Sequence, residues 1–343
     1  MGCGTIALRS ISPRFRWPSN VPESNKVIEL ANLTIPEPSQ NLFDLLASKG
    51  DGFFLTNVTT EKIYISANSK VLLISKGDVS DFVIPNDVDM SLEELYISNV
   101  PLKRLPQNLV ALDKLQYLSL NNLMLKILDL SIFSGLKISA IDINGMGSKV
   151  MCSVNAKLDN LTEFSIRNSS LSVDFTQFAA PLLKPFDLGS NKLRSIPKSL
   201  AIFKSNITNL FISNNELKQL EMDFFLGFNN LWLLYATSCS ISKIVVKKLK
   251  ALPKLETLNL ENNQLTEIVA LSKVALPNLS VITLKRNLIK KFRTVPQWPK
   301  LQFVHLQDNP IDCGWARASG ALKTNWTSQP HFGISVGMCS VSR

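Results

Sequence analysis

The stretch LETLNLENNQL, residues 255–265, decides the fold of this chain. It has Leu at its first, fourth, sixth and eleventh positions and Asn at its ninth, and residues 207–217 (ITNLFISNNEL) and 183–193 (LKPFDLGSNKL) repeat this spacing. The template L-x-x-L-x-L-x-x-N-x-L fits ten segments, spaced 22 to 24 residues apart, which begin at Leu92, Leu115, Ile138, Leu161, Leu183, Ile207, Leu231, Leu255, Leu279 and Leu301. Chance does not hold that register over ten units, so the chain is built from an internal repeat.

Each repeat predicts a short strand followed by a turn. Apolar residues at positions 4 and 6 alternate as in a strand, and a single unit cannot bury that face alone, so the units must stack. The amide at position 9 can satisfy backbone groups that the turn leaves unpaired. This position holds Asn191, Asn215, Asn263, Asn287 and Asn309, with Ser169 and Cys239 as small polar substitutes. Other units have Val100, Leu123 and Met146 there, and we expect these N-terminal units to be less regular.

The upstream units depart from the template. The unit from Ile138 contains Gly145 and Gly147, which predict a local backbone irregularity. A weaker unit begins at Ser69, and two degenerate ones are expected around residues 27–35 and 53–58.

The repeat resembles the leucine-rich repeat family over roughly residues 69–343. The segment NPIDCGW, residues 309–315, with a helix expected over 316–323, resembles the C-terminal cap of extracellular members. The resemblance implies an α/β solenoid, a leucine-rich repeat horseshoe with a parallel β-sheet on the concave face and a C-terminal cap. It also implies a disulfide between Cys313 and Cys339, with two unlinked thiols as the open alternative. We expect a poorly ordered or incomplete N-terminus (1–24), degenerate repeats (25–91), ten repeats (92–312) and the cap (313–343).

The composition is that of a folded protein with an excess of positive charge. Of 343 residues, 45% are hydrophobic and 19% charged, and no apolar run is long enough for a transmembrane helix. The formal net charge is +10, and residues 240–300 hold twelve Lys and Arg against three Glu. This basic segment is either a solvated surface or a docking patch for an anionic partner such as a sulfated glycan.

Two features of the sequence indicate the cellular compartment of the protein. The sequence N-x-S/T, which is the acceptor for N-glycosylation, occurs at Asn32, Asn57, Asn160, Asn168, Asn206, Asn278 and Asn325. At Asn160, Asn206 and Asn278 the alternative is that the motif only satisfies the repeat consensus. The first twenty residues do not read as a signal peptide, and we expect the true start to be missing. The cap and the sequons favour an extracellular or secreted protein.

No catalytic constellation is present in the sequence. G-x-S-x-G, P-loop, H-E-x-x-H and C-x-x-C patterns are all absent, and only two His occur. We therefore expect no enzyme, no catalytic residue, no metal site, no cofactor and no nucleic-acid partner. Cys239 is interpreted as buried in the repeat, whereas pairing of Cys152 with a partner chain is left open.

The predicted binding face is the outward side of the strands, at positions 3, 5, 7 and 8. Phe211, Leu233 and Tyr235 are predicted to form one apolar patch on adjacent strands. The full set of ligand-binding candidates on this face is Phe211, Leu233, Tyr235, Asn259, Lys285, Arg286 and His305.

The combination of repeat length, cap and sequons is similar to insect secreted leucine-rich repeat proteins, including mosquito leucine-rich immune proteins and Toll-type ectodomains. The similarity implies a recognition module that binds a protein ligand, in innate immunity or cell-surface signalling. An anionic glycan ligand and an oligomeric state stay open. The rival hypothesis is an intracellular scaffold or regulatory subunit.

Overall fold

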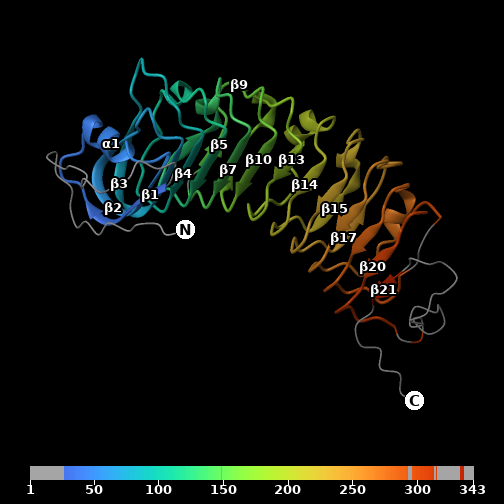
Figure 1. Cartoon of the computed structure of the whole chain (residues 1–343). Coiled ribbons are helices and arrows are strands. Elements are labelled where there is room, and N and C mark those ends of the chain that lie inside the picture. Colours follow the sequence, from blue (N-terminus) through green and yellow to red (C-terminus); the bar gives the residue numbers. More distant parts are fainter. Residues whose placement is uncertain (1–26, 148, 293–295, 313, 315–332, 336–343) are drawn as a thin grey trace. The chain divides into compact units, whose positions relative to one another are not determined.

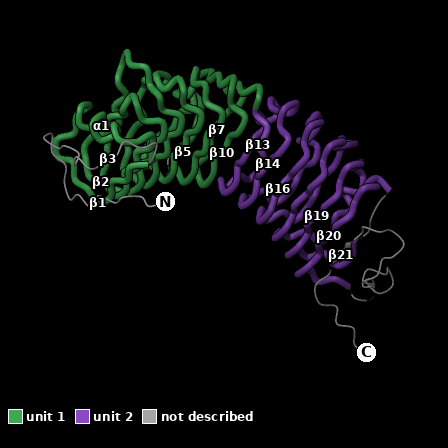
Figure 2. Tube along the Cα trace, viewed as in Figure 1, with its two compact units in different colours: residues 1–182 green, residues 183–343 purple. Residues whose placement is uncertain are grey.

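The computed structural model describes residues 27–147, 149–292, 296–312, 314 and 333–335. It divides into two compact units, residues 1–182 (unit 1) and 183–343 (unit 2), which Figure 2 colours separately. Most of the predicted cap lies outside the described residues, and so do Cys313, Cys339 and Asn325. The disulfide and the N-terminal segment therefore stay as predictions.

Unit 1 is built on parallel strands that follow one another in sequence order (Figure 1). They are β1 (Val27–Thr34), β2 (Gly52–Tyr64), β3 (Val71–Val83), β4 (Glu94–Ser98), β5 (Tyr117–Asn121), β7 (Ala140–Asn144) and β10 (Glu163–Arg167). Positions 4 and 6 of the repeats are buried, as Leu95 and Ile97 show in β4. Strands occur at each of the three upstream stretches where degenerate units were expected.

The side of unit 1 away from these strands consists of short elements. Strands β6 (Ile127–Asp129), β8 (Lys149–Met151) and β11 (Ser170–Leu171) form a parallel layer, and β9 (Ala156–Lys157) pairs with β12 (Phe178–Ala179). The 3-10 helices are η1 (Leu109–Ala111), η2 (Leu130–Phe133) and η3 (Phe175–Gln177). Helix α1 (Gln40–Ala47) begins at Ser39, whose hydroxyl accepts the Leu42 N–H, and it buries Leu42, Phe43 and Leu46.

Unit 2 repeats the same plan with shorter strands. Its sheet contains β13 (Pro185–Asp187), β14 (Asn209–Phe211), β16 (Leu233–Tyr235), β18 (Thr257–Asn259), β19 (Val281–Thr283), β20 (Phe303–His305) and β21 (Gly333–Ser335). The opposite side holds β15 (Gln219–Glu221), which pairs with β17 (Lys243–Val245), and the 3-10 helices η4 (Lys198–Phe203), η5 (Met222–Phe225) and η6 (Val269–Lys273). The core lies between the two sides and is filled by the Leu, Ile and Phe of the repeat.

A buried asparagine ladder closes the turns of unit 2, as predicted. Asn215 Oδ1 accepts the N–H groups of Asn191 (3.0 Å) and Leu193 (2.9 Å). Its Nδ2 donates to the carbonyls of Leu188 (3.0 Å) and Ile212 (2.8 Å). One side chain thus satisfies four backbone groups in two successive repeats, which removes the cost of burying them unpaired.

The two predicted substitutes each supply half of this pattern. Cys239 is fully buried, and its thiol donates to the Ile212 carbonyl at 3.1 Å. In unit 1, Ser169 Oγ accepts the Met146 N–H at 3.3 Å and donates to the Arg167 carbonyl at 2.7 Å. A thiol is a weak acceptor, so Cys239 does not reproduce the paired acceptance of Asn Oδ1.

The predicted irregularity of the N-terminal units is wrong for their strands. Val100, Leu123 and Met146 are buried, yet β4, β5, β7 and β10 each run for five residues in unbroken register. Unit 1 instead places asparagine amides at the surface, where they bond to one another in what we call the surface ladder. Asn122 Nδ2 donates to Asn99 Oδ1 (3.0 Å), Asn144 to Asn121 (2.7 Å) and Asn168 to Asn144 (2.8 Å).

The irregularity predicted at Gly145 is also absent. Its φ is +68°, and the equivalent residues Asn99, Asn122 and Asn168 have φ of 46° to 54°. Gly145 therefore keeps the left-handed turn of its neighbours. A Cβ on Gly145 would lie 1.9 Å from Asn122 Oδ1, so any other residue at this position requires the Asn122 side chain to move.

Candidate recognition surface

The register of unit 2 brings the predicted binding residues into two rows on the exposed face of the sheet. Each strand pairs with the next at the same repeat position. The position 5 row is Phe211, Tyr235, Asn259, Thr283 and His305, and the position 3 row is Asn209, Leu233, Thr257, Val281 and Phe303.

Phe211, Leu233 and Tyr235 form what we call the aromatic patch. The rings of Phe211 and Tyr235 meet edge to face, with centroids 5.4 Å apart and an interplanar angle of 87°. Leu233 lies two residues before Tyr235 on β16 and therefore points to the same face. All three side chains are half-buried and none belongs to the core, so the predicted juxtaposition is present.

The position 3 row extends this apolar surface beyond the predicted set. Val281 on β19 is half-buried, and its partner Phe303 on β20 is 44% exposed. Both residues were missed as site candidates. Both residues occupy position 3 of the template, which points to the same side of the sheet as position 5 and could have identified them.

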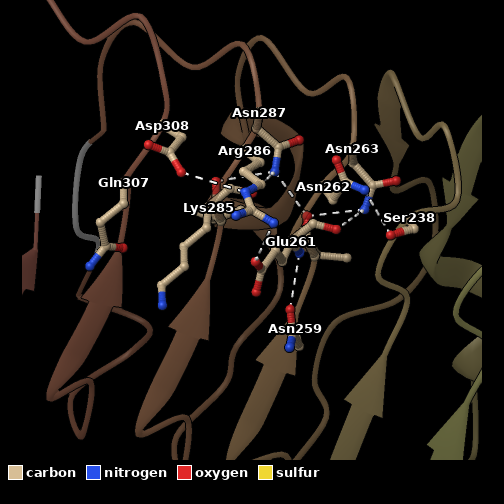
Figure 3. A network of polar contacts seen from close by, with 12 residues as sticks. Ser238, Asn259, Glu261, Asn262, Asn263, Lys285, Arg286, Asn287, Gln307 and Asp308 are labelled. Carbon is tan, nitrogen blue, oxygen red and sulfur yellow. Dashed lines mark hydrogen bonds and ion pairs between the residues drawn. The ribbon is translucent and has the colours of Figure 1, made fainter. Parts of the chain in front are cut away.

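Arg286 is not a free cation on the rim. Figure 3 shows its guanidinium between two carboxylates from the neighbouring repeats. Its Nη1 lies 3.9 Å from Glu261 Oε1, and its Nε lies 3.5 Å from Asp308 Oδ2. Arg286 has φ of +53°, a conformation that favours Asn or Gly, in a column where the other repeats of unit 2 carry Asn, Ser or Asp. The two ion pairs neutralise the charge of Arg286, which was predicted to bind a ligand.

Asn259 and Lys285 flank the same network. Asn259 Oδ1 accepts the Glu261 N–H at 3.0 Å, so this amide oxygen is already engaged in holding the turn (Figure 3). The Lys285 side chain is half-buried and projects beside Arg286. The upper rim of the face is therefore polar with compensating charges.

His305 is a neutral surface group. Burial, followed by the positive charge of Lys285, lowers its pKa below the usual value near 6.5. Its Nδ1 is buried, and no hydrogen-bond partner is found for it among the described residues. The imidazole therefore offers neutral hydrogen-bonding capacity beside Thr283 at neutral pH.

The described residues contain no group of three or more His, Cys, Asp or Glu able to hold a metal ion. Within the same residues, no helix is both long and apolar enough to cross a bilayer. Cys152 is buried, and its thiol donates to the Val154 carbonyl at 3.1 Å. That burial disfavours pairing of Cys152 with another chain.

The predicted glycosylation sites differ in accessibility. Asn32, Asn57, Asn160 and Asn168 are exposed, whereas Asn206 and Asn278 are half-buried. Asn278 Nδ2, the atom that would carry a glycan, donates to the Pro253 carbonyl at 2.6 Å. At this position the amide has a structural role that competes with modification.

The basic segment lies mostly on the surface. Lys243, Lys247, Lys248, Lys250 and Lys290 are exposed and have no ion-pair partner among the described residues. Lys291 lies 3.6 Å from Asp312 Oδ2, while Arg293 lies outside the described residues.

Comparison with known proteins supports the repeat at both the sequence and the structural level. Residues 253–311 match the family model of the leucine rich repeat, and no curated protein matches the sequence. A structure of the LRIM1/APL1C complex aligns with a TM-score of 0.62 and 19% identity over 91% of this chain, which spans 59% of the matched chain.

Two further structures have the same fold at low identity. The leucine-rich repeat domain of APL1 aligns with a TM-score of 0.57 and 17% identity over 96% of each chain. A structure of the Drosophila Toll–Spatzle complex aligns with a TM-score of 0.56 and 16% identity over 81% of this chain and 47% of the other. At these identities the likeness concerns the fold. The chain has the stacked parallel-strand solenoid fold of leucine-rich repeat proteins, and its residues 253–311 carry the sequence signature of that family.

Proposed function

We propose that the protein is a non-catalytic extracellular recognition module that binds a protein ligand through the exposed sheet face of unit 2. The observation that carries this proposal is the aromatic patch, in which Phe211 and Tyr235 pack edge to face without entering the core. Half-exposed aromatics in contact on a sheet face are typical of interface centres.

The surroundings of the patch favour a protein over a small charged ligand. Phe303 and Val281 continue the apolar row, and Arg286 is neutralised on the rim by Glu261 and Asp308. An apolar centre with a polar, charge-balanced rim is the usual anatomy of a protein interface. Two structural relatives are complexes of leucine-rich repeat proteins with protein partners, which supports the same use of the fold here.

The decisive experiment compares capture of secreted and cell-surface proteins by wild-type protein and variants. The double change Phe211→Ala and Tyr235→Ala should leave thermal stability within about 1 kcal/mol and weaken capture of a specific partner by at least about 2 kcal/mol. Leu288→Ala is the matched control, because Leu288 is 50% exposed outside the two rows and should be neutral. Equal capture by the double variant would place recognition elsewhere.

The extracellular assignment rests on the accessible sequons and has its own test. When the protein is expressed through the secretory pathway, a glycan is expected at the exposed Asn160, and the engaged amides of Asn168 and Asn278 should stay unmodified. Glycopeptide mass spectrometry measures this directly. An unglycosylated secreted protein would favour the intracellular scaffold instead.

An anionic glycan is the second candidate ligand, and it is favoured by the unpaired lysines of the basic segment. Lys247→Glu with Lys248→Glu should reduce retention on heparin, and the effect should fade at high salt because exposed charges are screened. Unchanged elution would identify these lysines as a solvated surface.

A further inference from the structure

The exposed sheet face of unit 1 carries an aromatic pair of different character. The rings of Tyr96 on β4 and Tyr117 on β5 lie with centroids 5.1 Å apart and are tilted by 37°. Both side chains are half-buried. On one flank the register places small side chains beside them, Ser119 next to Tyr96 and Ala140 next to Tyr117. On the other flank Leu73 lies next to Tyr96 and Glu94 next to Tyr117.

Carboxylates border the two rings on both sides. Glu94 lies next to Tyr117 by register, and its Oε2 accepts the Tyr96 hydroxyl at 2.8 Å. On the other side Glu163 pairs with Ala140, so it lies two strands from Tyr117. Asp142 lies two strands from Tyr96 by register. We call the set of Tyr96, Tyr117, Glu94, Asp142 and Glu163 the acidic tyrosine patch.

The patch has an unbalanced negative charge. Asp142 Oδ1 is paired with Arg167 at 2.9 Å, whereas Glu163 is exposed and has no ion-pair partner among the described residues. Three carboxylates and one guanidinium leave a local charge of −2 in a protein whose formal net charge is +10. A negative site on a basic protein selects positively charged partners.

Both phenols stay protonated at neutral pH, so the rings keep their electron-rich faces. Burial, then the hydrogen bond to Glu94, raises the pKa of Tyr96 to about 12. Burial, then the charge of Asp142, raises the pKa of Tyr117.

A polar atom without a partner lies beside the carboxylates. The Ser165 hydroxyl oxygen is buried and makes no hydrogen bond among the described residues, and Ser165 pairs with Asp142 by register. An N–H donor that reached this oxygen would satisfy it.

We propose that the acidic tyrosine patch is a second docking site, which receives an arginine side chain from a protein partner. A guanidinium can stack on a tyrosine ring and also reach a carboxylate with two parallel N–H groups, which a lysine ammonium cannot do. The site lies wholly in unit 1 and uses none of the residues of the unit 2 proposal. An anionic ligand is disfavoured here by repulsion from the three carboxylates.

The test measures binding of the peptide Gly-Arg-Gly-Arg-Gly to the whole protein by titration calorimetry at low and physiological salt. Peptides with lysine or with neutral citrulline in place of arginine serve as chemical controls. Tyr117→Ala should weaken arginine-peptide binding about tenfold, and Tyr117→Phe should retain it because the ring remains. Glu163→Gln should weaken binding about threefold.

The matched control is Asp113→Asn, which removes the same charge from another exposed residue of unit 1 and should have no effect. Circular dichroism of each variant checks that it folds. Equal binding of the citrulline peptide, or equal loss with Asp113→Asn and Glu163→Gln, would overturn the proposal, because binding would then be unspecific. Undiminished binding by folded Tyr117→Ala would overturn it as well. Loss of arginine-peptide binding by the Phe211→Ala, Tyr235→Ala variant would move the site to unit 2.

Discussion

The two units stabilise the same turn with different side chains. Unit 2 buries an amide at position 9, where Asn215 or Asn263 bonds the backbone of two repeats from inside. Unit 1 buries apolar side chains such as Leu123 there and pairs partly exposed amides at positions 7 and 8, as in the pair Asn144 and Asn121. Both arrangements keep the left-handed residue at position 8. The repeat therefore requires the turn conformation and leaves open which side chains support it.

The largest expected loss of stability comes from removing a buried asparagine of unit 2. Asn263→Ala removes the partner of the Cys239 and Ile241 N–H groups and of the Ala236 carbonyl, while the Leu260 carbonyl keeps its bond from Asn287. Buried groups left unpaired cost about 1–3 kcal/mol each, so the free energy of unfolding should fall by on the order of 4 kcal/mol.

The matched change in unit 1 should be mild. Asn144→Ala removes two bonds between partly exposed amides, and we expect a loss of about 1 kcal/mol or less. Urea denaturation of both variants measures the difference. Equal losses of unfolding free energy would mean that the two ladders stabilise the protein equally, which contradicts the comparison.

Gly145 tests the left-handed position that the two units share. Gly145→Ala places a Cβ against Asn122 Oδ1 at φ of +68°, so a loss of about 2 kcal/mol is expected. Gly147→Ala is the control from the same repeat, because a Cβ there meets nothing within 4 Å. Thermal unfolding of the pair should show a clear shift for the first and almost none for the second. A neutral Gly145→Ala would show that the turn tolerates other conformations.

Cys239 offers a further test within unit 2, because it replaces asparagine at position 9 and interrupts the asparagine ladder. Cys239→Asn should restore acceptance of backbone N–H groups in the preceding repeat and raise the free energy of unfolding by about 1 kcal/mol. Cys239→Ala, which also loses the bond to the Ile212 carbonyl, should lower it. A destabilised Cys239→Asn variant would indicate that this repeat is too tightly packed for an amide.

The smallest effect concerns the tyrosines of unit 1. The pKa of Tyr96 is about 12 in the folded protein against 10.0 for an ordinary tyrosine, so its contribution to stability is present below pH 10 and is lost as the pH rises through 12. Glu94→Gln should lower this pKa, since it removes the carboxylate. Ultraviolet titration of the phenolate detects the change, and an unchanged titration curve would assign the whole shift to burial.

The period of the repeat was enough to predict which residues become neighbours across strands. Phe211 and Tyr235 are 24 residues apart, and this single fact places their rings in contact. The position 9 asparagines were found for the same reason. The surface ladder of unit 1 was not, because its Asn residues fall at positions that the template leaves unspecified.

Side-chain pairing across repeats was harder to predict than strand register. Arg286 was expected to be a ligand-binding residue, but its side chain lies between Glu261 and Asp308, and nothing in the repeat template encodes that geometry. Gly145 was interpreted as a break because glycine often marks one. Its φ shows that it fills the position where neighbouring repeats use Asn.

The most direct test of the central claim is hydroxyl-radical footprinting of the protein alone and bound to a captured extracellular partner. Protection is expected at Phe211, Tyr235 and Phe303, while Leu288 and Trp232, which are exposed outside the two rows, should be modified equally in both states. Unchanged modification of Phe211 and Tyr235 in the complex would contradict recognition through this face.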